Sequence, residues 1–361
     1  MPGNYISDFK EKFTGFKRNK KRVLNMATIK EIADKSNVSA STVSRVLNND
    51  HTLTVQAKTR ERILRVAKEL GYETILERRL KQKQQDTKHV GIMLTQSLDE
   101  EISDPYFLSI RQGIEMELAH NGIKTATFRL HETEGNQMIE ELDGLIVVGR
   151  VKESTLKAIS RVDNVVYINH SPNEDLYDSV VINFERATEK ALRHLLATGY
   201  KRIGYIGGKE MEHLKNQKLL SEDKRLTTFE RYMKEKNLYN QESIFIGEYT
   251  MAQGYQLMKK AIQTSKLPEA FFIGSDPMAI GALRAIQEAN LHVPEDVAII
   301  SFDDIEAAKF ASTPLTTIRV HTKEMGQTGV KLLLDRLNGR ELPLTVTLPT
   351  ELVIRESCGG K

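Results

Sequence analysis

Apolar side chains near the start of the chain recur at i, i+3 and i+4 in three short stretches, the spacing of helices with one buried face. The first two stretches follow Thr28 and Ser39, which can cap a helix, and the third ends at Gly71, a usual helix stop. The pattern predicts a compact bundle of three helices. The apolar positions are Ile29, Ile32 and Ala33; Val43, Val46 and Leu47; and Ile63, Val66, Ala67 and Leu70.

From residue 89 onward, short apolar runs alternate with longer amphipathic stretches. The runs include HVGIML, GLIVVG, NVVYIN, SVVIN, RIGYIG, AFFIG and VAIISF, and helices are predicted over 105–121, 184–198, 223–236, 277–289 and 322–338. This alternation is typical of parallel sheets covered by helices on both faces. The strands are too many for one ordinary sheet, so we expect two lobes, with the turn-rich run at 169–179 crossing between them.

These patterns divide the chain into an all-α head and an α/β body. Residues 1–25 are predicted to form a disordered basic extension, 26–72 the head, 73–88 a polar linker and 89–361 the body. Within the body, we expect lobe one at about 89–169 and 321–338, and lobe two at about 175–316 and 341–361.

Charge divides the chain at the same place. Residues 1–88 carry 20 Lys and Arg against 10 Asp and Glu, a net of +10, whereas the remainder carries a net of −7. A basic head on an acidic body indicates a polyanion-binding module, although a solvated basic tail has the same charge. The single cysteine, Cys358, excludes an internal disulfide, and neither a signal peptide nor a membrane span is present in the sequence. We therefore expect a cytoplasmic protein.

The stretch SASTVSRVLNN (39–49) separates apolar and polar residues on opposite faces of the second predicted helix. Its polar face carries Ser41, Ser44, Arg45 and Asn48. The turn before it contains Asn37, which tolerates the left-handed backbone that a helix-turn-helix needs. Hydroxyls, an amide and an arginine can contact DNA phosphates and base edges. The alternative is the solvated face of an ordinary small helix.

Two long stretches give a specific resemblance. ATIKEIADKSNVSASTVSRVLNN and TVQAKTRERILRVAKELGY resemble the DNA-binding head of the lactose/galactose repressor family (LacI/GalR). Family-like body segments include ATGYKRIGYIGG, GSDPMAIGALRAI, VPEDVAIISFDD and TPLTTIRVHTKEMG, so that the resemblance extends over residues 26–355. DPYFLSIRQGIE and IRVHTKEMG are most similar to regulators of galactose and β-galactoside operons.

The resemblance implies a division of DNA contacts within the head. Base contacts fall on Ala40, Ser41 and Arg45. Phosphate contacts fall on Thr28, Ile29, Ser39, Thr42, Ser44, Asn48, Thr54 and Thr59. The linker lacks the proline that usually follows the tyrosine, and Leu80 is the candidate for a minor-groove wedge, unless it packs within the linker.

For the body, the resemblance implies a two-lobed, periplasmic-binding-protein-like fold with a small sugar between the lobes. Carboxylates, arginines and aromatic rings suit sugars, and parallel sheets bind ligands at their strand ends. The candidate residues are Tyr106, Phe107, Glu189, Arg225, Phe229, Ser275, Asp276 and Asp303. Structural alternatives remain open: a salt bridge or cap for Asp303 and Arg225, a helix cap for Asp276, and core packing for the aromatic rings of Tyr106 and Phe107.

Glu189 stands where sugar-responsive relatives often carry an arginine, which favours a neutral galactoside-like sugar over a sugar phosphate or a purine. The sequence thus predicts a homodimeric repressor of galactose or β-galactoside utilisation genes, bound to double-stranded operator DNA and released by its sugar effector. Helices 105–121 and 277–289 are the expected dimer interface, and no coiled-coil tetramer is expected.

Catalytic motifs, metal-ligand spacings and cofactor signatures are absent from the sequence, so neither an enzyme nor a cofactor is predicted. Two other functions remain open. One is a regulator whose ligand or protein co-effector strengthens DNA binding, and the other is a soluble sugar-binding protein of the transport type.

Overall fold

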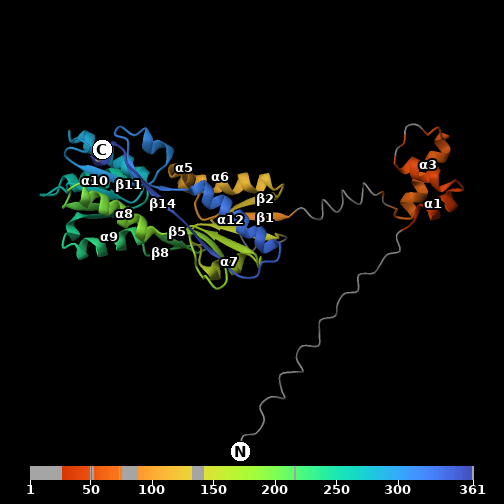
Figure 1. Ribbon diagram of the computed structural model, residues 1–361, viewed down its shortest axis with the longest axis horizontal. Coiled ribbons are helices and arrows are strands. Elements are labelled where there is room, and N and C mark those ends of the chain that lie inside the picture. Colours follow the sequence, from red (N-terminus) through yellow and green to blue (C-terminus); the bar gives the residue numbers. More distant parts are fainter. Residues whose placement is uncertain are drawn as a thin grey trace, which may run out of the picture. The chain divides into compact units, whose positions relative to one another are not determined.

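The computed structural model describes residues 27–48, 50, 53–72, 74, 88–131, 142–214 and 217–359 (Figure 1). The chain divides into two compact units between Asp86 and Thr87, a head and a body, and each is described by itself. The predicted extension at 1–25, most of the predicted linker and the candidate wedge Leu80 lie outside the described residues.

Among its described residues the head has the three helices that were predicted: α1 (Ile29–Ser36), α2 (Ala40–Leu47) and α3 (Ala57–Glu69). Ile32, Val43 and Ile63 are fully buried where the helices meet. The three apolar stripes read from the sequence form one cluster, in which the remaining stripe residues are buried or half-buried. Helical periodicity was sufficient here because each helix has only one face to bury.

The body contains two twisted sheets of six strands each among its described residues. The first has the order β13-β5-β4-β3-β1-β2 and the second the order β14-β12-β11-β10-β6-β9. Neighbouring strands are parallel except for β12 and β14. The first-sheet strands are β1 (His89–Leu94), β2 (Lys124–Arg129), β3 (Gly144–Val148), β4 (Val165–Ile168), β5 (Asp178–Ile182) and β13 (Thr345–Leu348). The second-sheet strands are β6 (Ile203–Gly208), β9 (Ile244–Gly247), β10 (Ala270–Ile273), β11 (Ala298–Asp303), β12 (Thr316–Val320) and β14 (Thr350–Val353).

Helices cover both faces of each sheet. In the first lobe, α6 and α12 pack on one face and α7 on the other; in the second, α8 and α9 face α10 and α11 across the sheet (Figure 1). The helices are α5 (Leu98–Ser103), α6 (Pro105–His120), α7 (Glu153–Ile159), α8 (Phe184–Ala197), α9 (Lys224–Glu235), α10 (Met251–Ile262), α11 (Asp276–Glu288) and α12 (Thr322–Leu337). None of the described helices is both long and apolar enough to cross a membrane. The predicted fold class, an all-α head with an α/β two-lobed body, is confirmed.

The predicted lobe boundaries were wrong in two places. Residues 175–182 and 341–348 were placed in lobe two, but β5 pairs with β4 and β13 pairs with β5 in the first sheet. The chain therefore crosses between lobes after β5, rather than within 169–179. A buried charge cluster explains the difference: Asp178 is fully buried and accepts hydrogen bonds from Arg336 and Arg340 of the first lobe.

In the second lobe, α10 and α11 approach closely enough to require glycine. A Cβ atom on Gly281 would lie 1.9 Å from the carbonyl oxygen of Met251, and one on Gly254 would lie 2.1 Å from that of Met278. Only glycine allows the two backbones to approach this closely. The pair therefore forms one tightly packed layer over the second sheet.

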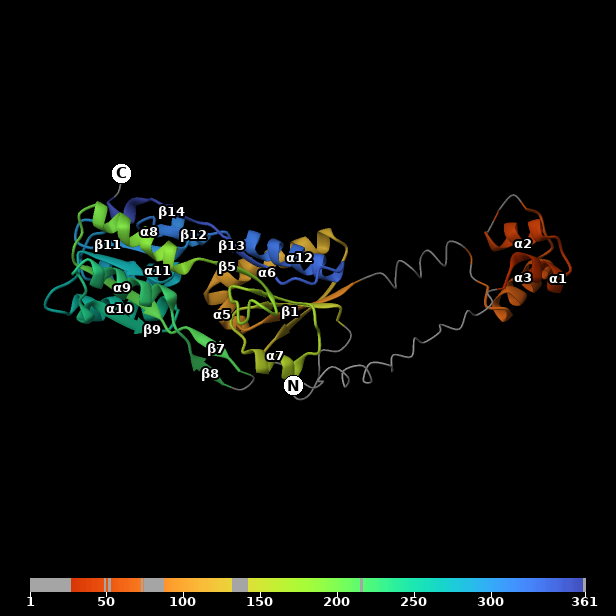
Figure 2. The ribbon, with the colours of Figure 1, turned by 60° about the horizontal axis from the view of Figure 1, so that its bottom comes forward.

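A two-stranded hairpin lies outside both sheets. Its strands are β7 (Met211–His213) and β8 (Lys218–Leu220), between β6 and α9 in the chain. Figure 2 shows the hairpin leaving the second lobe and running along the first. The sequence analysis did not predict it, because three-residue strands are too short to show a period.

Candidate functional site

Local interactions cap both ends of α1, and its last residue leads into the turn before α2. Thr28 Oγ1 accepts a hydrogen bond from the backbone N–H of Glu31 at 3.3 Å, and the backbone N–H of Thr28 donates to Glu31 Oε2 at 2.7 Å. Asn37 ends α1 with φ of 50°, the left-handed conformation expected from the sequence. This geometry fixes the direction in which α2 leaves the turn.

Helix α2 presents its polar residues to solvent. Ser39 caps the helix by accepting a hydrogen bond from the Thr42 N–H at 3.2 Å, and Val43 and Val46 face the core. Ala40, Ser41, Arg45 and Asn48 are exposed, and Thr42 and Ser44 are half-buried. The residues assigned to DNA on this helix therefore share an accessible surface.

Two polar contacts on this surface were not foreseen. Arg45 Nε donates to Asp50 Oδ2 at 2.7 Å, and Asn48 Nδ2 donates to the carbonyl oxygen of Ser44 at 2.9 Å. The ion pair orients the guanidinium along the end of α2. Of the other candidates, Thr54 is exposed before α3, whereas Ile29 and Thr59 are half-buried.

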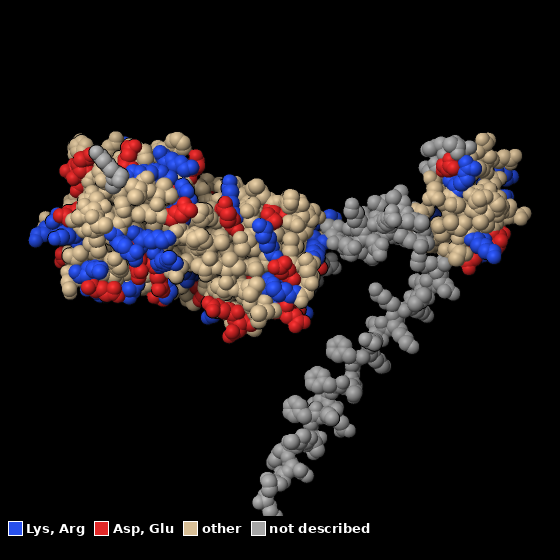
Figure 3. Space-filling model, in the orientation of Figure 1, with Lys and Arg blue, Asp and Glu red and all other residues tan. Residues whose placement is uncertain are grey.

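The charge of the described head is smaller than that of the whole N-terminal segment. The described residues up to position 74 carry eight Lys and Arg against five Asp and Glu, a net of +3. Most of the +10 excess therefore belongs to residues outside the described ranges. On the face of the body drawn in Figure 3, basic and acidic side chains are interspersed rather than gathered into a field of one sign.

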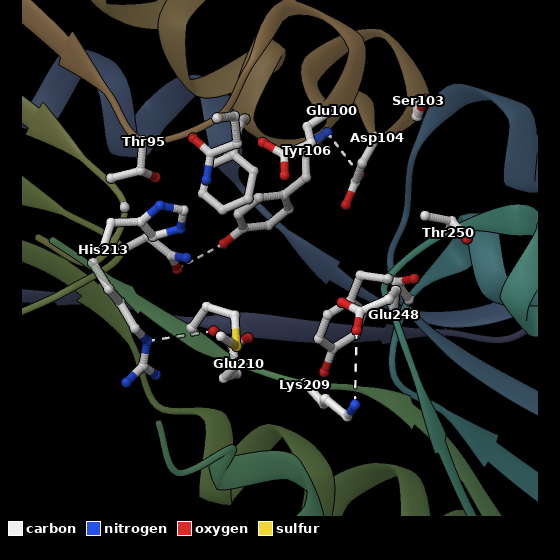
Figure 4. A pocket seen from close by; sticks show the side chains of 18 of the residues that line it. Thr95, Glu100, Ser103, Asp104, Tyr106, Lys209, Glu210, His213, Glu248 and Thr250 are labelled. Carbon is white, nitrogen blue, oxygen red and sulfur yellow. Dashed lines mark hydrogen bonds and ion pairs between the residues drawn. The ribbon is translucent and has the colours of Figure 1, made fainter. Parts of the chain in front are cut away.

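The body contains a cavity of about 670 Å³ between its two lobes (Figure 4). From the first lobe, residues that follow β1, β3 and β4 and residues on α5 and at the start of α6 line it. From the second lobe, the lining comes from the ends of β6, β9, β10 and β11, from the β7–β8 hairpin and from the first turns of α8 and α9. The carboxyl ends of both sheets thus meet at this cavity, as expected for open parallel sheets.

Five of the eight predicted effector residues line the cavity: Tyr106, Phe107, Arg225, Ser275 and Asp303. The hydroxyl of Tyr106 donates to Asn169 Oδ1 at 2.9 Å, across the first lobe (Figure 4). Ser275 caps α11 by accepting a long hydrogen bond from the Met278 N–H at 3.4 Å.

Arg225 is the most highly connected of these residues. Its side chain is 7% exposed and donates to both carboxylate oxygens of Asp223, at 3.0 and 3.1 Å. It also donates to the carbonyl oxygen of Gly274 at 2.9 Å and pairs with Glu210. The guanidinium carbon lies 4.6 Å from the centre of the Tyr249 ring, a cation–π distance. Arg225 therefore occupies a fixed position in the wall of the cavity.

Asp303 is a buried carboxylate at the end of β11, with φ of 112°. Few residues other than glycine adopt that backbone, and such strain gathers at functional sites. Burial raises the pKa of Asp303 well above its ordinary value, and the nearby carboxylates of Asp104 and Asp276 raise it further. Burial also raises the pKa of Asp104. A strained, poorly solvated carboxylate is well placed to bond ligand hydroxyls.

The structure does not bring the other three candidates into the lining. Glu189 pairs with Arg231 on the outer side of α8, and Phe229 is buried with its ring 5.3 Å from that of Tyr205. Asp276 is fully buried and accepts hydrogen bonds from Thr317 at 2.8 Å and from the Ile305 N–H at 2.8 Å. Burial raises its pKa to about 7. These three are structural residues.

Several lining residues were missed by the sequence analysis. Asn169 ends a predicted strand and Asp104 caps α6, so the strand-end rule and capping pattern could have indicated both. Tyr249 follows β9, which is only half-buried and gave no clear apolar run. Met211 and His213 belong to the hairpin that the sequence did not predict.

Comparison with known proteins agrees with this arrangement. The family model of bacterial regulatory proteins of the lacI family matches residues 28–74, and that of the periplasmic binding protein-like domain matches residues 192–358. The HTH-type transcriptional repressor MelR of Bacillus subtilis (strain 168) is 53% identical, over 92% of this chain and 98% of its own. The chain belongs to the LacI family.

Further relatives match over most of the chain as well. The HTH-type transcriptional regulator GalR of Lacticaseibacillus casei is 35% identical, over 92% of this chain and 99% of its own. The crystal structure of the Lac repressor dimer bound to operator and the anti-inducer ONPF superposes with a TM-score of 0.65 at 25% identity, over 92% of this chain and 99% of that one. The CelR–cellobiose complex has the same fold, with a TM-score of 0.64 at 24% identity, over the same shares of the two chains.

Membership in the LacI family makes this chain a DNA-binding transcriptional repressor and not an enzyme. The predicted family is therefore confirmed.

Proposed function

We propose that this LacI-family repressor binds an inverted-repeat operator as a homodimer and that a neutral galactoside-like sugar in the body cavity relieves repression. The single observation that carries the sugar assignment is the charge of the cavity wall. Carboxylates outnumber cationic side chains in the described lining, six to four.

Each of those four cations already has a carboxylate partner. Lys218 lies 2.8 Å from Glu100, and Arg150 lies 3.4 Å from Glu210. Lys209 lies 3.9 Å from Glu248, and Arg225 bonds Asp223 as described above. A phosphorylated or acidic effector would have to compete for these cations and lie against surplus carboxylates, at a large desolvation cost. A neutral polyol instead donates its hydroxyls to carboxylates and rests its apolar face on aromatic rings.

The galactose class is favoured by the resemblance of DPYFLSIRQGIE and IRVHTKEMG to regulators of galactose and β-galactoside operons. Relatives named GalR and GanR, each 35% identical over 92% of this chain, are consistent with that class. Glu189 does not support the galactose class, because its side chain pairs with Arg231 and lies outside the cavity wall.

For the head, the accessible face of α2 supports base contacts by Ala40, Ser41 and Arg45. Ser44 and Asn48 stand beside them for phosphate contacts. An arginine at this position can bond guanine O6 and N7, a pair that contributes about 1–3 kcal/mol of discrimination. Breaking the Arg45–Asp50 ion pair would accompany such a contact.

Operator binding by the purified full-length protein tests the proposal. The probe is the DNA upstream of its own gene, in gel shifts with and without galactose and galactosides. We expect sugar to weaken the shift, and Arg45→Ala to weaken it about 5- to 150-fold without sugar. Arg231→Ala, which removes the same charge from the body surface, should leave DNA binding unchanged.

Three outcomes would contradict parts of the proposal. A sugar that tightens the shift would favour the alternative of a ligand-strengthened regulator. Sugar binding without any effect of Arg45→Ala on DNA would disprove the assigned base contact. Sugar binding without DNA binding would favour a transport-type binding protein.

A further inference from the structure

The β7–β8 hairpin is bonded to the first lobe although it belongs to the second in sequence. The backbone N–H of His213 donates to the carbonyl oxygen of Arg150 at 2.8 Å, and the Lys152 N–H donates to the His213 carbonyl oxygen at 3.2 Å. The segment after β3 thus pairs with β7 through a parallel bridge between Val151 and His213. The backbone of β7 is fixed on the first lobe.

Side chains hold the second strand in the same way. Lys218 Nζ lies 2.8 Å from Glu100 Oε1 on α5. Arg150 donates through Nη1 to Ser221 Oγ at 3.2 Å, just after β8. Both strands of the hairpin are therefore anchored to the first lobe, and the hairpin forms a wall across one side of the cavity.

The inner surface of this wall faces the cavity. Met211, His213 and Lys218 all line it, and Figure 4 shows His213 with Thr95 on one side while Glu248 and Thr250 lie on the other. His213 is buried, and burial lowers its pKa to about 4, so the ring is neutral at physiological pH. The Nδ1 atom already lies 3.2 Å from His131 Nε2, so Nε2 is the ring nitrogen left to bond a sugar hydroxyl, as donor or acceptor according to the tautomer. The thioether of Met211 offers an adaptable apolar surface beside it.

The groups assigned to the sugar under the proposed function lie on the second lobe rather than on the hairpin. Asp303 and Ser275 come from the central strand ends of the second sheet, and Arg225 donates to the carbonyl oxygen of Gly274, the residue before Ser275. The hairpin wall is instead attached to the segment after β3 and to α5 of the first lobe. Two adjoining sets of sugar-compatible groups therefore line one cavity, and the pair of Arg225 with Glu210 joins them next to Met211. The cavity volume of about 670 Å³ lies well inside the range of small-molecule sites.

We propose that the β7–β8 hairpin forms a second sugar subsite, so that this repressor selects a two-ring galactoside over galactose itself. One ring lies against Asp303 and Arg225, and the other against Met211 and His213. This inference rests on the proposed function, because it specifies the length of the sugar that the cavity accepts.

Isothermal titration calorimetry on the full-length protein tests it, with galactose and with disaccharides that contain one galactose ring as probes. We expect a disaccharide to bind about tenfold or more tightly than galactose, since one added group in a fitted pocket is typically worth that much. Met211→Ala and His213→Ala should each weaken disaccharide binding about tenfold and change galactose binding less than about twofold.

His292→Ala is the matched control, because His292 is an exposed histidine of the second lobe that does not line the cavity. His213→Gln, which keeps a donor and an acceptor, should recover part of the lost affinity. Operator binding by each variant, measured separately, verifies that the protein is folded.

The outcomes separate this inference from the proposed function. Equal affinities for galactose and every disaccharide, or hairpin variants that weaken both sugars equally, would overturn the second subsite and leave the sugar-responsive repressor intact. Failure of every galactose-containing sugar to bind the unaltered protein would overturn both.

Discussion

Arg225 gives the sharpest test of how the cavity wall is held together. Arg225→Met removes the guanidinium and keeps a side chain of similar length. Asp223 is then left with its carboxylate 5% exposed and without its cation. Tyr249 still donates its hydroxyl to Asp223, but a neutral donor does not compensate a buried charge.

The low exposure of the Asp223 carboxylate sets the expected loss of stability. Removing one partner from a buried ion pair costs about 3–5 kcal/mol of unfolding free energy. At about 2–4 °C per kcal/mol for a domain of this size, the midpoint of the body's thermal transition should fall by roughly 6–20 °C. In the native protein, burial alone would raise the pKa of Asp223, but the charge and hydrogen bonds of Arg225 outweigh it and lower that pKa.

The destabilisation caused by Arg225→Met should depend on pH. A depressed carboxyl pKa contributes stability above the ordinary pKa of 3.8, and that contribution is lost as the pH falls through the depressed value. In Arg225→Met this pKa rises instead, because burial now dominates. The destabilisation should therefore be larger at neutral pH than under mildly acidic conditions, where the stranded carboxyl can take up a proton.

Thermal unfolding followed by far-UV circular dichroism measures the effect. Arg231→Met is the matched control, on the same helix and also paired with carboxylates, but with a side chain 47% exposed. Exposed pairs contribute little, so its midpoint should barely move. The double variant Asp223→Asn/Arg225→Met should recover much of the loss. A midpoint for Arg225→Met equal to that of Arg231→Met would refute the reasoning.

Three further predictions concern the body. In buffers above neutral pH, Asp303→Asn should raise the melting midpoint by about 2–4 °C, because a carboxyl group with a raised pKa destabilises the fold as the pH rises through that pKa. Calorimetry on the same variant should show that sugar binding is abolished. Burial lowers the pKa of His170 and of His213 to about 4. The stability that each neutral ring contributes above pH 6.5 is therefore lost as the pH falls toward 4, by up to about 3 kcal/mol each. In urea titrations, the unfolding free energy of His213→Gln should fall less steeply with acid than that of the unaltered protein. Gly281→Ala should cost about 1–3 kcal/mol in the same urea assay, since its Cβ would strike the Met251 carbonyl, and an unchanged midpoint would contradict that close approach.

The features that the sequence predicted well are those decided by neighbouring residues. Thr28 and Ser39 cap their helices by accepting hydrogen bonds from residues three positions later. Asn37, with its left-handed backbone, ends α1 and bonds carbonyl groups of the last helical turn. The predicted helix over 105–121 corresponds to α6, which ends one residue earlier. A period or a cap is visible in a single window of sequence because all its interacting groups lie in that window.

The lobe boundaries and three site residues depended on distant partners instead. Asp178 meets Arg336 across 158 positions, and this pairing places β5 and β13 in the first sheet. Glu189, a candidate site residue in the sequence, pairs with Arg231 of the next helix and lies outside the cavity. A carboxylate in a sequence is compatible with a ligand or with an ion pair, and only the facing residue decides between them.

Asp303 shows how such ambiguity resolves when several physical signals coincide. Its backbone is in a sparsely populated region and its carboxyl group is buried. Burial raises its pKa, the neighbouring carboxyl groups of Asp104 and Asp276 raise it further, and the charge of Arg225 does not offset them. A residue selected for stability alone would be glycine or asparagine there, since either adopts that backbone more readily and neither carries a charge. The aspartate therefore costs the body stability, and the gain that offsets it must come from something that bonds the carboxylate. The proposed site assigns that gain to sugar hydroxyls, so the stability increase expected for Asp303→Asn and its expected loss of sugar binding would have one cause.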